Sequence, residues 1–272
     1  MPHLTNKFAC LADLPSMPAL LTEALHYLND KHNLAKLVDK IGQDPSMTVR
    51  ILRIANSPFY GMSREIGSLR EAIVLLGLNR IRDMLVSICF SKLLPAWHKD
   101  FDYRQFYHHS MAVAECSRQL AICSGLNPDL AFTSGLLHDI GRLVIVALFP
   151  DEFTRIQQEN SLSLLETERR ILGFDNLEIG GKAAHHWNFP LSIQEAIEQH
   201  KNPPRPDTGK SLGLLVYTAD TLISKAKQAD ESTSEVDDTM HIARDTLNIS
   251  AEQSARCTES GLQFANQIIT LF

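Results

Sequence analysis

Apolar residues recur along most of the chain at the spacing of an α-helix, whereas the strict alternation of apolar and polar residues typical of strands is nearly absent. Helix-start signals such as Asp44-Pro45 and Asn127-Pro128 separate the periodic stretches. We find no repeat of fixed period. The pattern therefore predicts an all-α fold of roughly a dozen helices.

The predicted helices cover residues 18–29, 34–42, 45–56, 69–76, 79–94, 103–124, 128–141, 143–149, 150–159, 164–172, 177–187, 191–200, 212–226, 238–247 and 251–271. Gly77 is expected to form a left-handed cap between two of them. The proline-rich segment 201–209 and the acidic segment 229–238 are predicted loops. The one clear boundary, residues 94–102, gives three parts: an N-terminal helical bundle (1–95), a second bundle packed on it (96–228), and an acidic loop with C-terminal helices (229–272).

The charge is small and unevenly distributed. The chain carries 32 acidic and 26 basic residues, a formal charge of −6, but five of the acids lie in the segment 229–238, which has no base. The rest of the chain is nearly neutral, so the net charge is only a weak argument against a nucleic-acid partner, which we nevertheless do not expect. Residues 69–94 have a helix–turn–helix outline with Arg80 and Arg82, but the apolar face of 79–94 favours burial over contact with DNA.

The five cysteines show no Cys-x-x-Cys pair, and reduced, mostly buried thiols are expected. The N-terminus lacks the pattern of a signal peptide, and the longest apolar run, 143–149, is too short to cross a bilayer. We therefore expect a soluble, cytoplasmic protein with no membrane partner.

The strongest chemical signal is the pair His138-Asp139. It stands between an apolar run and Ile140-Gly141, in a region, 98–200, that holds seven of the eleven histidines. Imidazole and carboxylate presented together suit Fe, Mn, Zn or Ni better than Mg or Ca. The alternative is that the pair simply ends a helix.

The segment Leu137-His138-Asp139-Ile140-Gly141 resembles the signature of the HD superfamily of metal-dependent phosphohydrolases. The resemblance implies one ligand upstream, His109 in His109-Ser110-Met111, and one downstream, Asp220 in Ala219-Asp220. A lone carboxylate is costly to bury in a helix as apolar as 212–226, which favours a role for Asp220 in a site. A position on the solvent face is the alternative.

The chain as a whole resembles the HDOD domain, an HD-related output domain of bacterial signalling proteins. The matching motifs cover about residues 10–225 and include Leu14-Pro15-Ser16-Met17-Pro18, Leu52-Arg53-Ile54-Ala55-Asn56-Ser57, Leu69-Arg70-Glu71-Ala72-Ile73 and Trp187-Asn188-Phe189-Pro190. The second bundle should then be of HD type. Asn176 and Lys201 stand where a two-metal relative would have histidines, so we expect one metal ion rather than two.

The resemblance implies a regulatory signalling module that keeps a one-metal site and acts through a partner protein in trans or a small phosphorylated ligand. The alternative is a metal-dependent phosphohydrolase or phosphodiesterase acting on a nucleotide or cyclic nucleotide. In that case Arg142 would balance phosphate charge, and His200 would act as general acid or support a ligand. Both are our candidate catalytic residues.

Overall fold

The computed structural model describes residues 8–14, 16, 18–26, 31–91, 98–159, 161–202, 209–227 and 234–269, and all regular structure among them is helical. This confirms the predicted all-α class. The elements are η1 (Ala9–Asp13), α1 (Ala19–His26), α2 (Lys31–Gly42), α3 (Pro45–Ala55), η3 (Pro58–Tyr60), α4 (Leu69–Leu76), α5 (Leu78–Phe90), α6 (Tyr103–Ser124), α7 (Pro128–Leu137), α8 (Ile140–Leu148), α9 (Pro150–Gln158), α10 (Leu164–Leu172), α11 (Asn176–His186), α12 (Leu191–Gln199), α13 (Leu212–Lys227), α14 (Ser234–Leu247) and α15 (Ala251–Ile268).

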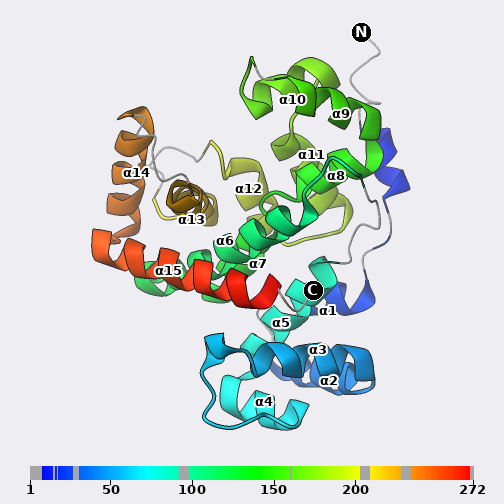
Figure 1. Ribbon diagram of the computed structural model, residues 1–272, viewed down its shortest axis with the longest axis vertical. Helices are drawn as coiled ribbons and strands as arrows, with labels where there is room; N and C mark the ends of the chain where they lie inside the picture. The colour runs from blue at the N-terminus through cyan, green and yellow to red at the C-terminus, as the bar shows by residue number, and fades with distance from the viewer. Residues whose placement is uncertain are drawn as a thin grey trace.

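The N-terminal bundle forms one end of the molecule, with α2, α3 and α4 together and α5 leading into the central helices (Figure 1). Asp44 caps α3 as predicted, since its carboxylate accepts a hydrogen bond from the Met47 backbone N–H at 3.0 Å. Gly77 has φ +88° and ψ 157°, so it is not the left-handed cap that we expected. Its φ still lies in the positive region that favours glycine, its N–H donates to the backbone oxygen of Ile73, and it turns the chain directly from α4 into α5.

Helix α5 is buried on the face predicted to be apolar: Ile81, Met84, Leu85, Ile88 and Phe90 are all at most 1% exposed. Its two arginines are engaged within the protein. Arg82 is buried and pairs with Asp83 at 2.7 Å and with Asp129 of α7 at 3.0 Å, while Arg80 reaches Glu115 of α6 at 3.1 Å. These pairs join the two bundles, and they leave neither guanidinium free to read a base.

The central bundle contains α6, α7, α8, α11, α12 and α13 (Figure 1). The predicted helix 128–141 is wrong at its end, because the chain breaks at His138-Asp139 and restarts as α8. Asp139 leaves the helical conformation at φ −97°, ψ 16°. Residues 128–148 are apolar and long enough to cross a membrane by composition alone, but 83% of their most apolar 18-residue window is buried inside the structure. It is therefore the core of the bundle.

Close packing fixes the start of α8. A Cβ added to Gly141 would lie 1.9 Å from the backbone oxygen of Asn176, at the start of α11. Only glycine allows the two helices to approach this closely. The contact holds the first turn of α8, which follows Asp139, against α11.

The C-terminal helices complete the central bundle. Helix α15 lies along α6 (Figure 1), and the ring of Phe264 meets Phe59 of the η3 segment at 5.0 Å between centroids. Helix α14 begins at Ser234, inside the segment 229–238 that we predicted to be a loop. The loop predictions for 229–233 and for 203–208 lie outside the described residues.

Candidate metal centre

His138 lies at the C-terminal end of α7 and is 1% exposed. Its Nδ1 is 2.7 Å from the backbone oxygen of Gly135. A carbonyl oxygen only accepts, so the ring carries its proton on Nδ1 and a lone pair on Nε2. That buried Nε2 finds no hydrogen-bond partner among the described residues. An imidazole oriented through one nitrogen with the other nitrogen open is the usual arrangement of a metal ligand.

His200 repeats this arrangement just beyond α12. It is fully buried, its Nδ1 donates to the backbone oxygen of Ile197 at 2.8 Å, and its Nε2 lies 3.3 Å from Oδ1 of Asp139. A nitrogen lone pair and a carboxylate oxygen are both acceptors. They are stable this close only when a proton or a cation lies between or beside them.

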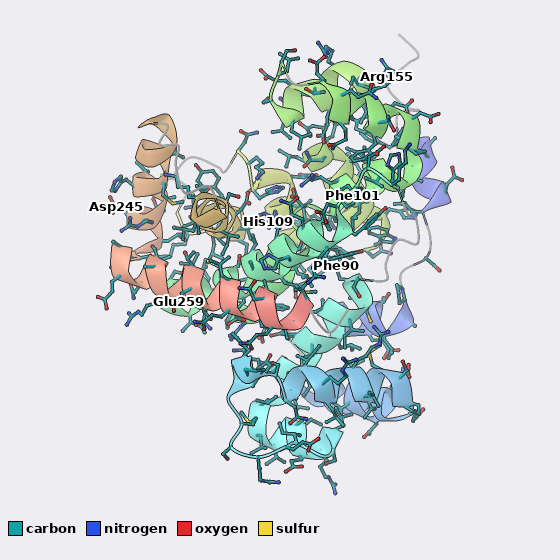
Figure 2. All side chains as sticks on the ribbon, in the orientation of Figure 1. Phe90, Phe101, His109, Arg155, Asp245 and Glu259 are labelled. Carbon is teal, nitrogen blue, oxygen red and sulfur yellow. The ribbon has the colours of Figure 1, made fainter. Side chains whose placement is uncertain are left out.

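His109 on α6 and Asp220 on α13 close the cluster from the opposite side. His109 Nε2 lies 3.0 Å from Asp220 Oδ1, and the same carboxylate oxygen lies 3.9 Å from His138 Nε2. His138 Nε2 is also 3.7 Å from Asp139 Oδ2. His109 lies on α6 in the middle of the molecule (Figure 2), where α6 packs against α7 and α13.

Burial and charge keep the cluster in the protonation state that metal ligands need. Burial lowers the pKa of His138 to about 3, so this ring is neutral. Burial opposes ionisation of Asp139, but the neighbouring His138, His200 and Arg142 still hold its pKa well below the ordinary value. The pKa of Asp220 is lowered in the same way, against burial, by His109 and by the charge of Lys201.

The donor set fits a divalent transition metal. Two overlapping groups have ligand atoms within 4.8 Å of one another: His109, His138 and Asp139, and His138, His200 and Asp220. Mixed imidazole and carboxylate donors suit Fe, Mn, Zn or Ni. The two open, buried Nε2 atoms beside carboxylates supply a separate reason to expect a cation.

The cluster opens into a polar pocket of about 560 Å³. Arg142 and Lys201 bring two positive charges to its wall. Arg142 Nη1 is 3.5 Å from Asp139 Oδ2, and its guanidinium lies over the ring of Phe101 at 5.8 Å. Lys201 forms an ion pair with Asp220 Oδ2, and although burial opposes its charge, Asp220 and Asp139 raise the pKa of Lys201. The remaining lining residues are Asp100, Asp102, Gln105, Phe106, His109, Asp139, Gln157, Asp220 and Ser224.

The structure brings together all six residues selected from the sequence: the four candidate ligands His109, His138, Asp139 and Asp220, with Arg142 on the pocket wall and His200 beside Asp139. Asp220 is buried, so it does not lie on the solvent face. His200 belongs to the donor cluster more closely than we expected. From the sequence, Lys201 only marks a position where a two-metal relative would have a histidine. Its place directly after His200 is the one sequence feature that indicates a role near the site.

The other histidines with described side chains lie outside this cluster. His108, the neighbour of His109, points toward α15 and contacts Asn266 at 2.8 Å, while His186 and His241 are exposed. His26 and His32 have side chains outside the described residues.

Asn176 is buried in a structural pair instead of facing the pocket. Its backbone N–H and side-chain amide both donate to Oε2 of Glu168, at 2.8 and 2.7 Å. Burial raises the pKa of Glu168 to about 7, although these hydrogen bonds and the charge of Arg142 act in the opposite direction. Asn176 therefore supports the start of α11 next to Gly141 and is not among the candidate ligands.

The HDOD domain family matches residues 14–203, and the chain belongs to this family. Solved structures with the same fold include an HDOD domain protein with unknown function from Geobacter sulfurreducens, with 23% identity, a TM-score of 0.82, and coverage of 99% of this chain and 98% of that one. A protein from Shewanella amazonensis has 24% identity and a TM-score of 0.79, and the match covers 98% of this chain and 99% of that one.

The matching curated relatives are longer than this chain. An uncharacterised protein of Treponema pallidum is 27% identical over 78% of this chain and 42% of its own length. A deoxyguanosinetriphosphate triphosphohydrolase-like protein of Azorhizobium caulinodans is 29% identical over 43% of this chain and 29% of its own length. The chain thus spans less than half the length of these relatives. Family and site together define an HD-like module of regulatory or phosphohydrolase type.

Proposed function

We propose that this protein is a regulatory module that holds one divalent transition metal ion and binds a small phosphorylated ligand beside it. The observation that carries the proposal is the pair of buried imidazoles of His138 and His200, whose Nε2 atoms lie beside carboxylate oxygens and have no hydrogen-bond partner among the described residues. Such a cluster is unfavourable unless a proton or a cation joins it. His109, His138, Asp139 and Asp220 would hold that ion.

A bound ion of this kind supplies a positive charge for a phosphoryl oxygen and lowers the pKa of coordinated water. The chain adds binding groups around it. Arg142 presents a forked donor suited to phosphate, and Lys201 adds a second positive charge. Phe101 and Phe106 provide an apolar wall for the organic part of the ligand. The pocket is large enough for a nucleotide-sized molecule.

Hydrolysis of a phosphoester is the second candidate, favoured by the resemblance to the triphosphohydrolase-like relative and by the open pocket next to the donor set. In that case His200 would hold Asp139 in place and would not serve as general acid, because it is fully buried and does not line the pocket. A regulatory module would pass its signal to a protein partner, and a cytoplasmic location stays a prediction.

The test begins with protein purified without a His-tag or chelator, loaded with Mn²⁺. Cyclic dinucleotides, nucleotides and p-nitrophenyl phosphate are screened for binding by thermal shift and for turnover by product release. Binding that depends on the metal, without turnover, supports the regulatory function. Turnover that disappears in His138→Ala supports the second candidate. Metal-loaded protein that neither binds nor hydrolyses any of these compounds contradicts both.

A further inference from the structure

Lys201 occupies an unusual position for a lysine next to a metal site. It directly follows His200, whose Nδ1 hydrogen bond to Ile197 anchors the chain at the end of α12. From there its side chain reaches the buried carboxylate of Asp220 on α13 and forms an ion pair with Oδ2. The Lys201 side chain is 39% exposed, so it lies at the boundary between the donor cluster and the pocket.

The two oxygens of Asp220 therefore face different environments. Oδ1 lies 3.0 Å from His109 Nε2, 3.3 Å from the hydroxyl of Ser224 and 3.9 Å from His138 Nε2. Oδ2 faces the ammonium group of Lys201. An ion among the imidazoles would meet Asp220 through Oδ1 alone, since the other oxygen already has a cation.

The charges around the two carboxylates also indicate that Lys201 limits the access of an ion to Asp220. Asp139 and Asp220 supply two negative charges, and each contacts a basic side chain through Oδ2, Arg142 and Lys201 respectively, although Oδ2 of Asp139 also faces His138 Nε2 at 3.7 Å. The contact of Lys201 is the closer of the two. A divalent ion entering the site is repelled by this ammonium group at short range, where screening by solvent is weak.

We propose that Lys201 acts as a built-in cation that reserves one oxygen of Asp220, weakens metal binding and limits the site to a single ion. This inference rests on the proposed metal site and identifies the residue that sets its affinity and capacity. Lys201 is thus a positioning residue for Asp220.

The experiment is a calorimetric titration of the metal-free full chain with Mn²⁺, and separately with Zn²⁺. Lys201→Met removes the charge and keeps the length, whereas Lys201→Arg keeps the charge. We expect Lys201→Met to bind at least tenfold more tightly than the wild type and Lys201→Arg to stay within threefold of it. Lys182→Met, at an exposed lysine on α11 away from the pocket, is the matched control and should leave the affinity unchanged.

A double-mutant cycle with Asp220→Asn separates the direct contact from a general charge effect. In the Asp220→Asn background, replacing Lys201 by Met should change the affinity by less than twofold. Circular dichroism and thermal melting show that each variant is folded. Equal Mn²⁺ affinity of wild type and Lys201→Met overturns the inference while leaving the proposed function standing. Absence of binding in every folded variant, wild type included, overturns the proposed metal site itself.

Discussion

Two buried polar clusters lie against α6, and they differ in how completely their atoms are paired. At Glu115 the carboxylate accepts from Arg118 at 2.6 and 2.8 Å, from Gln119 at 2.7 Å and from Arg80 at 3.1 Å. At the metal centre, one helical turn and a half toward the N-terminus, the Nε2 atoms of His138 and His200 are buried beside carboxylate oxygens and have no hydrogen-bond partner among the described residues. The first cluster is complete as it stands, and the second is complete only with a cation.

This difference in pairing indicates that the Glu115 cluster stabilises the fold, whereas the histidine cluster is suited to binding an ion. Burial opposes ionisation of Glu115, but its arginine partners lower its pKa, so the carboxylate is charged and satisfied. It ties α5 to α6 and thereby joins the two bundles. The histidine cluster contributes acceptors instead, which costs stability in the absence of an ion and gives affinity in its presence.

The largest effect is expected at the paired cluster. Glu115→Ala leaves the buried guanidinium of Arg118 without its partner, so we expect a loss of about 3–5 kcal/mol in the free energy of unfolding, measured by urea denaturation. The affinity for Mn²⁺ in the remaining folded protein should not change. A loss below about 1 kcal/mol would show that Glu115 does not hold the bundles together.

The reverse pattern is expected at the metal centre. His138→Gln removes the open imidazole nitrogen, and Mn²⁺ affinity should fall at least about 100-fold by calorimetric titration, because a central ligand is lost. The unfolding free energy of the metal-free protein should change by less than about 1.5 kcal/mol. The comparison between the clusters breaks down if His138→Gln costs as much stability as Glu115→Ala.

Acid should destabilise the metal-free protein through His138. The unfolded chain binds a proton on this ring below its ordinary value of 6.5, whereas the folded chain does so only near 3. Protons therefore favour the unfolded state, and stability is lost as the pH falls below about 6.5. Between pH 6.5 and 5 the wild type should lose up to about 1.4 kcal/mol per pH unit relative to His138→Gln, measured by denaturation at each pH.

The comparison with His138→Gln is needed because two other groups act in the opposite direction. Burial raises the pKa of Glu168 to about 7 and that of Asp83 to about 6. Each favours the folded state as protons bind, so each adds stability toward acid pH over part of the same range. Their contributions are common to both proteins and cancel in the difference. A difference that does not vary between pH 6.5 and 5 would contradict a neutral His138.

The smallest loss of stability is expected for Arg80→Ala, because Glu115 has several hydrogen-bond donors. Arg80 is one of several donors to Glu115, and its side chain is 22% exposed. Arg80→Ala should therefore cost only about 1 kcal/mol by urea denaturation, since Arg118 and Gln119 still satisfy the carboxylate. A loss equal to that of Glu115→Ala would mean that Arg80 alone holds the cluster.

Periodicity was sufficient to predict the class of fold and most helices, because many of them have a distinct apolar face, although α7 is buried on all sides over residues 131–137. Helix 164–172 was predicted to the residue, and α6 likewise. The errors fall where tertiary contacts override the local pattern. The break at His138-Asp139 lies between two apolar segments with no proline to mark it, and the packing of Gly141 on Asn176 that accompanies it is invisible in the sequence.

The candidate site was predictable in its residue types and not in its connections. The motifs that resemble the HD signature selected His109, His138, Asp139 and Asp220. The ion pair of Lys201 with Asp220, however, depends on how the chain after α12 packs against α13. Local sequence carries no information on which carboxylate a lysine 19 positions away will reach. The division of Asp220 between an imidazole and an ammonium group therefore required the structure.

The central claim, that the histidine and aspartate cluster holds one transition metal ion, is tested most directly by the metal content of the full chain. Wild type and His138→Gln are purified side by side without tag or chelator, and Fe, Mn, Zn and Ni are quantified by inductively coupled plasma mass spectrometry before and after incubation with each metal. The account predicts one ion per chain in the wild type and none in His138→Gln. A wild-type protein that retains and takes up none of the four metals would contradict it.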